Sequence, residues 1–185
     1  FADLFAERGG FDLIIGNPPW IKLEWNEQNV LSEKQPVFVI RNYNATQIAQ
    51  HRHFPLADTD TRNLYLREYV QMDGMKSYLN AYQNYSVLKG QQTDLYKCFL
   101  PQAWQFTNEV GVSGFIHPNT VFEDSKGGIL RAALYPRLRY NYRFINELRL
   151  FSDVHHETKF GLSIYGKSER THFDMICKLY APSTI

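Results

Sequence analysis

A short apolar run that stops at two adjacent prolines constrains the fold of this chain more than any other feature. The run FDLIIG at residues 11–16 is followed directly by Asn17, Pro18, Pro19 and Trp20. Such a run predicts a strand that is buried on both faces, as the strands of parallel sheets are. Because neither proline can donate a hydrogen bond to a neighbouring strand, we expect the strand to end before them.

The rest of the chain predicts an alternation of helices and strands. We expect helices over residues 45–53, 61–88, 94–106 and 125–139, with Asp73-Gly74 as a candidate interruption of the second and Thr93 as the N-cap of the third. We expect strands over residues 111–118, 144–151, 160–165 and 173–180, and a polar turn at 167–170. This order predicts an α/β fold whose sheet is mostly parallel, with an antiparallel edge.

Residues 26–92 differ in composition from the remainder of the chain. Asn and Gln are dense in the first half of this stretch, and Tyr65, Tyr69, Met72 and Leu79 recur near helical spacing. An unstructured loop of this length would be unusual inside a compact domain. We therefore predict that residues 26–92 form a helical insertion within one domain that spans residues 1–185.

The composition argues against several classes of protein. A formal net charge of +1 is not that of a small, strongly basic nucleic-acid-binding domain, although a local basic face stays open. Cys98 and Cys177 are too few for a disulfide framework or a Cys-rich zinc site, and they indicate a reducing compartment. No apolar stretch approaches the roughly 20 residues of a membrane helix, and no signal peptide is evident. We therefore expect a cytoplasmic protein that binds neither a membrane nor a metal.

The turn after the first strand has the features of a binding site for a planar amine. Ligands of open α/β sheets lie at the carboxyl ends of the strands. Because two prolines stiffen the backbone, the side-chain oxygen of Asn17 and the carbonyl of Pro18 would be acceptors in fixed directions. Such a pair suits the exocyclic amine of adenine and would raise the electron density at its nitrogen. Trp20 adds an aromatic face on which a base turned out of a duplex could stack, for roughly 1–3 kcal/mol.

Residues 11–20 resemble motif IV of DNA amino-methyltransferases, in which Asp, Asn or Ser precedes Pro-Pro and an aromatic residue. Three later segments resemble this family in the same order. The segment DLYKCF at 94–99 is similar to the helix start that lies beside the cofactor's adenine. The segment GFIHPN at 114–119 is similar to the next strand and its proline. Leu150-Phe151, together with KFG at 159–161, is similar to the strand-loop-strand that packs against the flipped base. The chain looks most similar to the large adenine methylases of type IIG restriction–modification systems and of BREX phage-defence systems.

The resemblance implies a Rossmann-like class I methyltransferase fold and methylation of the N6 amine of adenine in DNA by a bacterial, cytoplasmic enzyme. The methyl donor would be S-adenosylmethionine, and the partner would be double-stranded DNA with a flipped adenine. The residues implied in catalysis are Asn17, Pro18, Pro19 and Trp20, with Trp20 and Phe151 packing on the base and Leu95 and Phe99 lining the cofactor pocket.

One part of the family's pattern is missing. The resemblance implies a glycine-rich cofactor loop after a first strand and an acidic residue after a second. Gly111 to Gly114 lie at the start of a predicted strand rather than joining a strand to a helix, and Gly127-Gly128 lie at a predicted helix start, so neither segment fits the loop. We expect this half of the domain upstream of Phe1, and a target-recognition domain elsewhere in the parent protein. The chain is thus predicted to be an incomplete, C-terminal half of the catalytic domain, inactive by itself. Trp20 is a mild departure, because Tyr or Phe is more common there.

Other interpretations stay open. The Asn-Pro-Pro-aromatic pattern also occurs in methylases of glutamine side chains and of RNA guanine amines. A non-catalytic DNA-binding or scaffold module could keep the same fold. Phe151 could be a core residue at a strand end, and Leu95 and Phe99 could be simple core positions.

Several polar groups receive no catalytic role. The His-His-Glu sequence at 155–157 lacks the spacing of a helical zinc site, and we interpret it as a polar loop. Asp58 and Asp60 lack the strand and the lysine of a nuclease site. Three arginines are predicted either to contact DNA phosphates or to lie favourably at a helix C-terminus. They are Arg137, Arg139 and Arg143.

Overall fold

The computed structural model describes residues 1–91, 94–167 and 171–185, and the chain divides into two compact units. The first unit consists of Phe1–Lys22 and Asn80–Ile185 and contains a five-stranded sheet. The second unit, Leu23–Leu79, is helical. The predicted N-cap Thr93 and most of the predicted polar turn at 167–170 lie outside the described residues.

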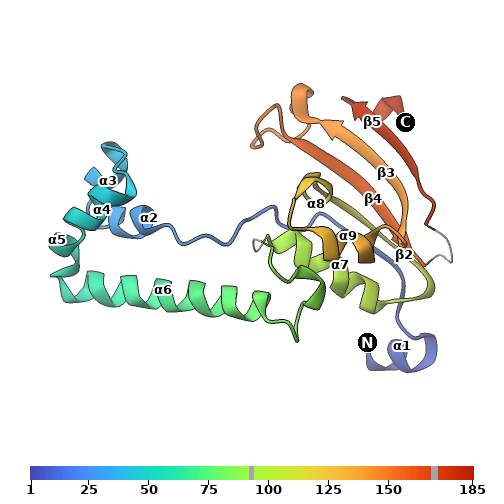
Figure 1. Cartoon of the computed structure of the whole chain (residues 1–185), viewed down its shortest axis with the longest axis horizontal. Coiled ribbons are helices and arrows are strands. Elements are labelled where there is room, and N and C mark those ends of the chain that lie inside the picture. The colour runs from blue at the N-terminus through green and yellow to red at the C-terminus, as the bar shows by residue number, and fades with distance from the viewer. Residues whose placement is uncertain (92–93, 168–170) are drawn as a thin grey trace. The chain divides into compact units, whose positions relative to one another are not determined.

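The sheet has the strand order β1-β2-β4-β3-β5 (Figure 1). Its strands are β1 (Phe11–Gly16), β2 (Thr107–Pro118), β3 (Leu138–Ile145), β4 (Lys159–Gly166) and β5 (Asp174–Leu179). The pairs β1–β2 and β3–β5 are parallel, whereas β4 is antiparallel to both β2 and β3. The α/β fold is confirmed, and it fits a Rossmann-like methyltransferase sheet. Four of the five strands run in the same direction, as the prediction of a mostly parallel sheet requires, but the predicted antiparallel edge is wrong, because the antiparallel strand β4 lies inside the sheet between β2 and β3.

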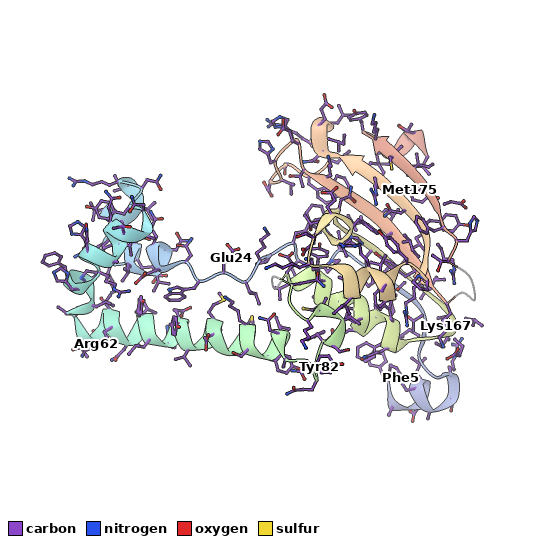
Figure 2. The ribbon with its side chains drawn as sticks, viewed as in Figure 1. Phe5, Glu24, Arg62, Tyr82, Lys167 and Met175 are labelled. Carbon is purple, nitrogen blue, oxygen red and sulfur yellow. The ribbon has the colours of Figure 1, made fainter. Side chains whose placement is uncertain are left out.

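The helices of the first unit include two that the sequence did not predict, at residues 2–8 and 120–123. The helices of this unit are α1 (Ala2–Arg8), α7 (Leu95–Phe106), α8 (Thr120–Glu123) and α9 (Gly128–Leu134), with 3₁₀ turns η1 (Ser86–Leu88), η2 (Asn146–Leu148) and η3 (Pro182–Thr184). Helix α1 was missed, and it is held by Phe5, labelled in Figure 2, whose ring meets Phe11 and Phe106 edge-on at 5.5 and 6.0 Å. After α1, Gly10 takes a φ of 142°, and a Cβ there would collide with the Phe106 carbonyl.

The sheet has one covered and one open face. On the covered face, alternate residues of β2 are buried, and the ring of His117 stacks on Tyr96 of α7. The open face is a shallow apolar surface formed mainly by Leu13, Ile15, Val112, Ile116, Leu162 and Ile164. Leu13 is 57% exposed and Ile15 is 76% exposed. The prediction that β1 is buried on both faces is therefore wrong for this unit, because β1 is an edge strand and helices cover only one of its faces.

Several predicted boundaries differ from the structure. The helix predicted over residues 125–139 is limited to α9, and the strand predicted over 144–151 begins earlier, at Leu138, and ends at Ile145. Arg139 consequently lies on β3, and Phe151 lies in the loop after it. The apolar residues near 150 belong to a loop that packs against the sheet, and apolar character alone does not distinguish this from a strand. The predicted helix at 94–106 and the predicted strands at 160–165 and 173–180 are confirmed.

The second unit contains five helices. They are α2 (Glu27–Ser32), α3 (Val37–Ile40), α4 (Ala45–His51), α5 (His53–Leu56) and α6 (Thr59–Asn80). Leu31, Phe38 and Ile48 form a small buried cluster. Asn44 and Gln47 start α4 with a reciprocal capping box, which confirms the predicted helix near 45–53. Helix α6 passes through Asp73-Gly74 without interruption and ends at Asn80, so the predicted helix over 61–88 is too long.

No helix in the described ranges combines the length and the apolar character needed to cross a membrane. Within the same residues, no three side chains of His, Cys, Asp or Glu gather closely enough to hold a metal ion. Both cysteines are free thiols; Cys98 is buried, and burial raises its pKa to about 11, whereas Cys177 is exposed.

Candidate functional site

The predicted turn lies where the parallel strands β1 and β2 both end. Asn17 is the first residue after β1, and its side chain is exposed. Its amide makes no hydrogen bond to any residue that the structure describes. Pro18 is buried and Pro19 is exposed, so the turn is anchored by one proline while Asn17 faces outward. This arrangement leaves the Asn17 side-chain oxygen available to an external donor.

Trp20 joins this turn to a loop from the other end of the sequence. Its Nε1 atom donates a hydrogen bond to the Ile116 carbonyl of β2 at 3.3 Å. Its ring lies 5.1 Å from the ring of Phe151 and 5.8 Å from the ring of Phe160, measured between centroids. The structure thus brings together Trp20 and Phe151, two of the residues implied by the resemblance. Phe151 is half-buried in a loop, so its interpretation as a strand-end residue is wrong.

The Trp20 and Phe151 rings are too close to hold a base between them as they stand. A base sandwiched between two rings needs them parallel and separated by more than their own contact distance, because the base must stack on both faces. The observed rings are 5.1 Å apart and inclined at 59°. A planar ligand could lie between the two rings only if they moved apart.

The start of α7 is tied to the same turn. The Leu95 amide donates to the Ile21 carbonyl at 3.0 Å, and Lys22 pairs with Asp94 as an isolated β-bridge. Leu95 is half-buried and Phe99, one helical turn later, is 42% exposed. The interpretation of Phe99 as a simple core residue is therefore wrong. The two side chains form an accessible apolar surface on α7, the helix that begins beside the Asn17–Trp20 turn.

A buried ion-pair cluster holds α7 in place. Lys97 is only 2% exposed, and its Nζ lies 2.8 Å from Asp124 and 3.2 Å from Asp94. The hydrogen bond from Lys97 holds the pKa of Asp124 below its usual value. Sequence reasoning missed this cluster, because Lys97 lies on the buried side of α7 and a lysine seldom signals a core position.

His117, at the end of β2, is closed off from the turn. It is fully buried, its Nε2 lies 2.8 Å from the Tyr165 hydroxyl, and its ring stacks on Tyr96. Burial lowers its pKa to about 4 and raises the pKa of Tyr165 above the ordinary value of 10. His117 is therefore neutral at pH 7 and is a structural group rather than a proton acceptor for a ligand at Asn17.

Two of the three arginines lie over aromatic rings, and the predicted polar loop is exposed. The Arg137 guanidinium lies over the Trp104 ring at 5.0 Å and donates to the Ala133 carbonyl at 2.6 Å, which confirms the helix C-terminus interpretation for this residue. Arg143 lies over Phe122 at 4.7 Å and donates to Asn141. Residues 155–157 are exposed, as expected for a polar loop.

The geometry agrees with a match to a known family. The family model described as Eco57I restriction-modification methylase matches residues 1–54 and 69–151 of the chain. The chain belongs to the Eco57I restriction-modification methylase family. The matched residues include the Asn17–Trp20 turn, α7, β2 and Phe151, so every residue to which the resemblance assigns a catalytic, base-stacking or cofactor role lies within the family match.

Three solved structures are similar to parts of this Eco57I-family chain. One is the DrdV–DNA complex, with 18% identity and a TM-score of 0.47. The second is a nuclease-deletion mutant of the Type ISP restriction-modification enzyme LlaGI with a DNA substrate mimic, with 19% identity and a TM-score of 0.44. The third is the ATP-dependent Type ISP restriction-modification enzyme LlaBIII bound to DNA, with 14% identity and a TM-score of 0.43. The matches cover 89%, 90% and 90% of this chain, which spans 14%, 12% and 10% of those chains, respectively. No curated protein matches the chain.

Proposed function

We propose that the full-length protein containing this chain transfers a methyl group from S-adenosylmethionine to the N6 amine of adenine in DNA. The observation that carries the proposal is the placement of Asn17 and Trp20 at the carboxyl end of β1, with Phe151 packed against Trp20. Membership in a restriction-modification methylase family supports methyl transfer as the reaction and DNA as the substrate.

In this proposal the turn activates the target amine. Asn17 accepts one amine hydrogen through Oδ1, and the Pro18 carbonyl accepts the other. The lone pair of an adenine amine is delocalised into the ring, and two fixed acceptors favour a more tetrahedral, more nucleophilic nitrogen. Trp20 and Phe151 supply aromatic surfaces for the flipped base. His117 is buried and neutral, so we assign it no part in removing the amine proton.

Leu95 and Phe99 fit one part of the methyl donor. When bound, S-adenosylmethionine supplies an electrophilic methyl group. Its flat adenine ring needs apolar surface, which these two side chains offer one helical turn apart on α7. We assign no residue of this chain to the ribose or the amino-acid end of the donor, and we expect those contacts in the other half of the methyltransferase domain.

The domain organisation is part of the proposal. We propose that the open face of β1 and β2 is covered in the full-length protein by the first half of the domain, because Leu13 and Ile15 are large apolar side chains left exposed. We also propose that residues 26–92 are a helical insertion, which the compact helical unit Leu23–Leu79 supports. Residues 1–185 produced alone should then bind an apolar dye and transfer no methyl group, whereas the full-length protein should transfer it and bind less dye.

The deciding experiment is methyl transfer by the full-length protein from labelled S-adenosylmethionine. Duplex DNA, RNA and protein are offered separately, and the labelled nucleoside is identified. We expect label in DNA N6-methyladenine, its loss in Asn17→Ala, and substantial activity in Asn17→Asp, which keeps a side-chain acceptor. Asn63→Ala is the matched control, because Asn63 is an exposed asparagine of α6 in the helical unit.

Each other outcome has a definite meaning. Label in RNA or in a glutamine side chain keeps the chemistry of the turn and replaces the substrate. Label in DNA that persists undiminished in Asn17→Ala removes Asn17 from catalysis. Folded protein that transfers no label to any substrate would point to a non-catalytic DNA-binding module.

A further inference from the structure

The loop that carries Phe151 is organised around a single buried side chain. Asn146 follows β3 as the first residue of η2, and it is fully buried. The chain then reverses at Arg149, which adopts a left-handed φ of 51°, and runs to β4 without a further helix or strand. Most of its residues between 149 and 158 are exposed, so the loop has little core of its own.

The Asn146 amide bonds to the backbone of Phe151 from both sides. Its Nδ2 donates to the Phe151 carbonyl at 2.9 Å, and its Oδ1 accepts from the Phe151 amide at 3.0 Å. The same Nδ2 donates to the Val154 carbonyl at 2.8 Å. An asparagine amide has two donor hydrogens and an oxygen with two lone pairs, so these contacts use both donors and one of the two acceptor positions. Asn146 therefore fixes the backbone at Phe151 and, through Val154, the next turn of the loop.

Fixing this backbone fixes the position of the Phe151 ring. The ring meets Phe160 edge-on at 5.0 Å and Trp20 at 5.1 Å, on the side of the sheet where the Asn17–Trp20 turn lies. Phe160 belongs to β4 and is buried, so it cannot shift easily. The distance between Phe151 and Trp20 therefore depends on where Asn146 holds the loop.

We propose that Asn146 is a positioning residue: it holds Phe151 at the site where the flipped base stacks. This inference rests on the proposed function and deepens it, because it names the group that sets the geometry of base capture. Asn146 itself touches no substrate. It acts through the backbone of Phe151, as a positioning group does when a small displacement of a binding surface lowers the rate.

A matched control exists on the same strand. Asn141 of β3 is also fully buried, and its amide is also hydrogen-bonded, to Ser163 and Arg143. Among the described residues it makes no hydrogen bond to Phe151 or to the rest of the loop. Asn141→Ala therefore removes a comparable buried amide without releasing the loop.

The test has one arm without substrate and one with it, both on the full-length protein. In the first arm, hydrogen exchange of the peptide covering residues 146–158 should become at least about tenfold faster in Asn146→Ala and stay unchanged in Asn141→Ala. Equal protection in the wild type and Asn146→Ala would overturn the positioning role. If Asn146→Ala does not fold, Asn146→Ser, which keeps one small polar group, takes its place with the same expectation at smaller amplitude.

The second arm is a double-mutant cycle on kcat/KM for DNA methylation. Asn146→Ala and Phe151→Ala should each lower kcat/KM about 10- to 100-fold, and the double variant should lose no more than the worse single one. Additive losses would show that Asn146 does not act through Phe151. Affinity for a duplex with an abasic target site should be equal in wild type and Asn146→Ala, because no base is present to stack.

The two arms separate the two proposals. A wild-type protein that methylates no DNA refutes the proposed function, and the exchange arm still decides whether Asn146 holds Phe151. Methylation that is intact in the wild type and equally intact in Asn146→Ala refutes the inference and leaves the proposed function standing.

Discussion

Two segments meet at the candidate site, and the backbone of each is held in its conformation by a different kind of interaction. The turn at residues 17–20 is stiff because two consecutive prolines restrict its backbone dihedrals, a covalent property. The loop at residues 146–158 is held by the Asn146 side chain, whose hydrogen bonds reach five and eight residues along the chain. The first constraint is visible in the sequence, whereas the second exists only after the loop has folded around the asparagine.

The comparison also separates two asparagines. Asn17 is exposed and makes no hydrogen bond to the described residues, so it has acceptor capacity for a ligand. Asn146 is fully buried, and both its amide nitrogen and its amide oxygen are hydrogen-bonded to the loop. The two asparagines therefore have different expected roles. Substitution of Asn17 should mainly lower activity, whereas substitution of Asn146 should also lower stability.

The largest expected effect is on catalysis at Asn17. Asn17→Ala should lower kcat by about 10²- to 10³-fold, the cost typical of removing one preorganised group that stabilises a transition state. The free energy of unfolding should change by less than about 0.5 kcal/mol, because the side chain is exposed. Initial rates with labelled methyl donor and urea unfolding curves measure the two quantities. A large stability loss would mean that Asn17 also has a structural role.

The next largest effect is the pH dependence of stability caused by His117 of β2, a strand of the sheet next to both segments. Burial holds the pKa of His117 at about 4, below its ordinary value of 6.5. Between these values the unfolded chain binds a proton that the folded chain does not, so stability should fall as the pH decreases from 6.5 to 4. The loss should reach about 3 kcal/mol and then level off. Urea unfolding at several pH values measures it, with exposed His156→Gln as control. A slope that survives in His117→Gln would assign it to another group.

A smaller effect is expected on stability at the loop. Asn146→Ala should lower the free energy of unfolding by about 2 kcal/mol, because it leaves part-buried backbone groups of Phe151 and Val154 without this partner. Thermal or urea unfolding of this variant beside Asn17→Ala tests the comparison directly. Equal stability of the two variants would show that the loop does not depend on its asparagine.

The smallest effect is expected at the exposed proline of the turn. Pro19→Ala should cost about 0.4–1 kcal/mol of stability, because the unfolded chain gains freedom. We expect a loss of activity below about tenfold, since Pro18 still restrains the turn and supplies its carbonyl. Pro182→Ala, at an exposed proline of η3, serves as the control in both assays. A loss as large as that of Asn17→Ala would mean that stiffness matters more than the acceptor.

Elements that depend on local interactions could be predicted from the sequence, whereas features that depend on distant contacts could not. The strand at 11–16 and the helix at 94–106 were predicted well, because their apolar spacing and flanking residues are local signals. The exposure of Leu13 and Ile15 was not, because it depends on which elements cover the strand. Phe151 was assigned to a strand because apolar residues precede it, whereas its place in a loop depends on Asn146.

By itself the sequence determined the stiff Asn17–Trp20 turn, the elements around it and the family pattern that the family match supports. Their physical basis is local: proline geometry and the periodicity of apolar residues act over a few positions. The tertiary structure alone decided that β4 lies between β2 and β3, that Trp20 meets Phe151, and that Asn146 holds the loop. These contacts join residues distant in the sequence or enclose a buried amide, and their free energy exists only when the whole sheet has formed.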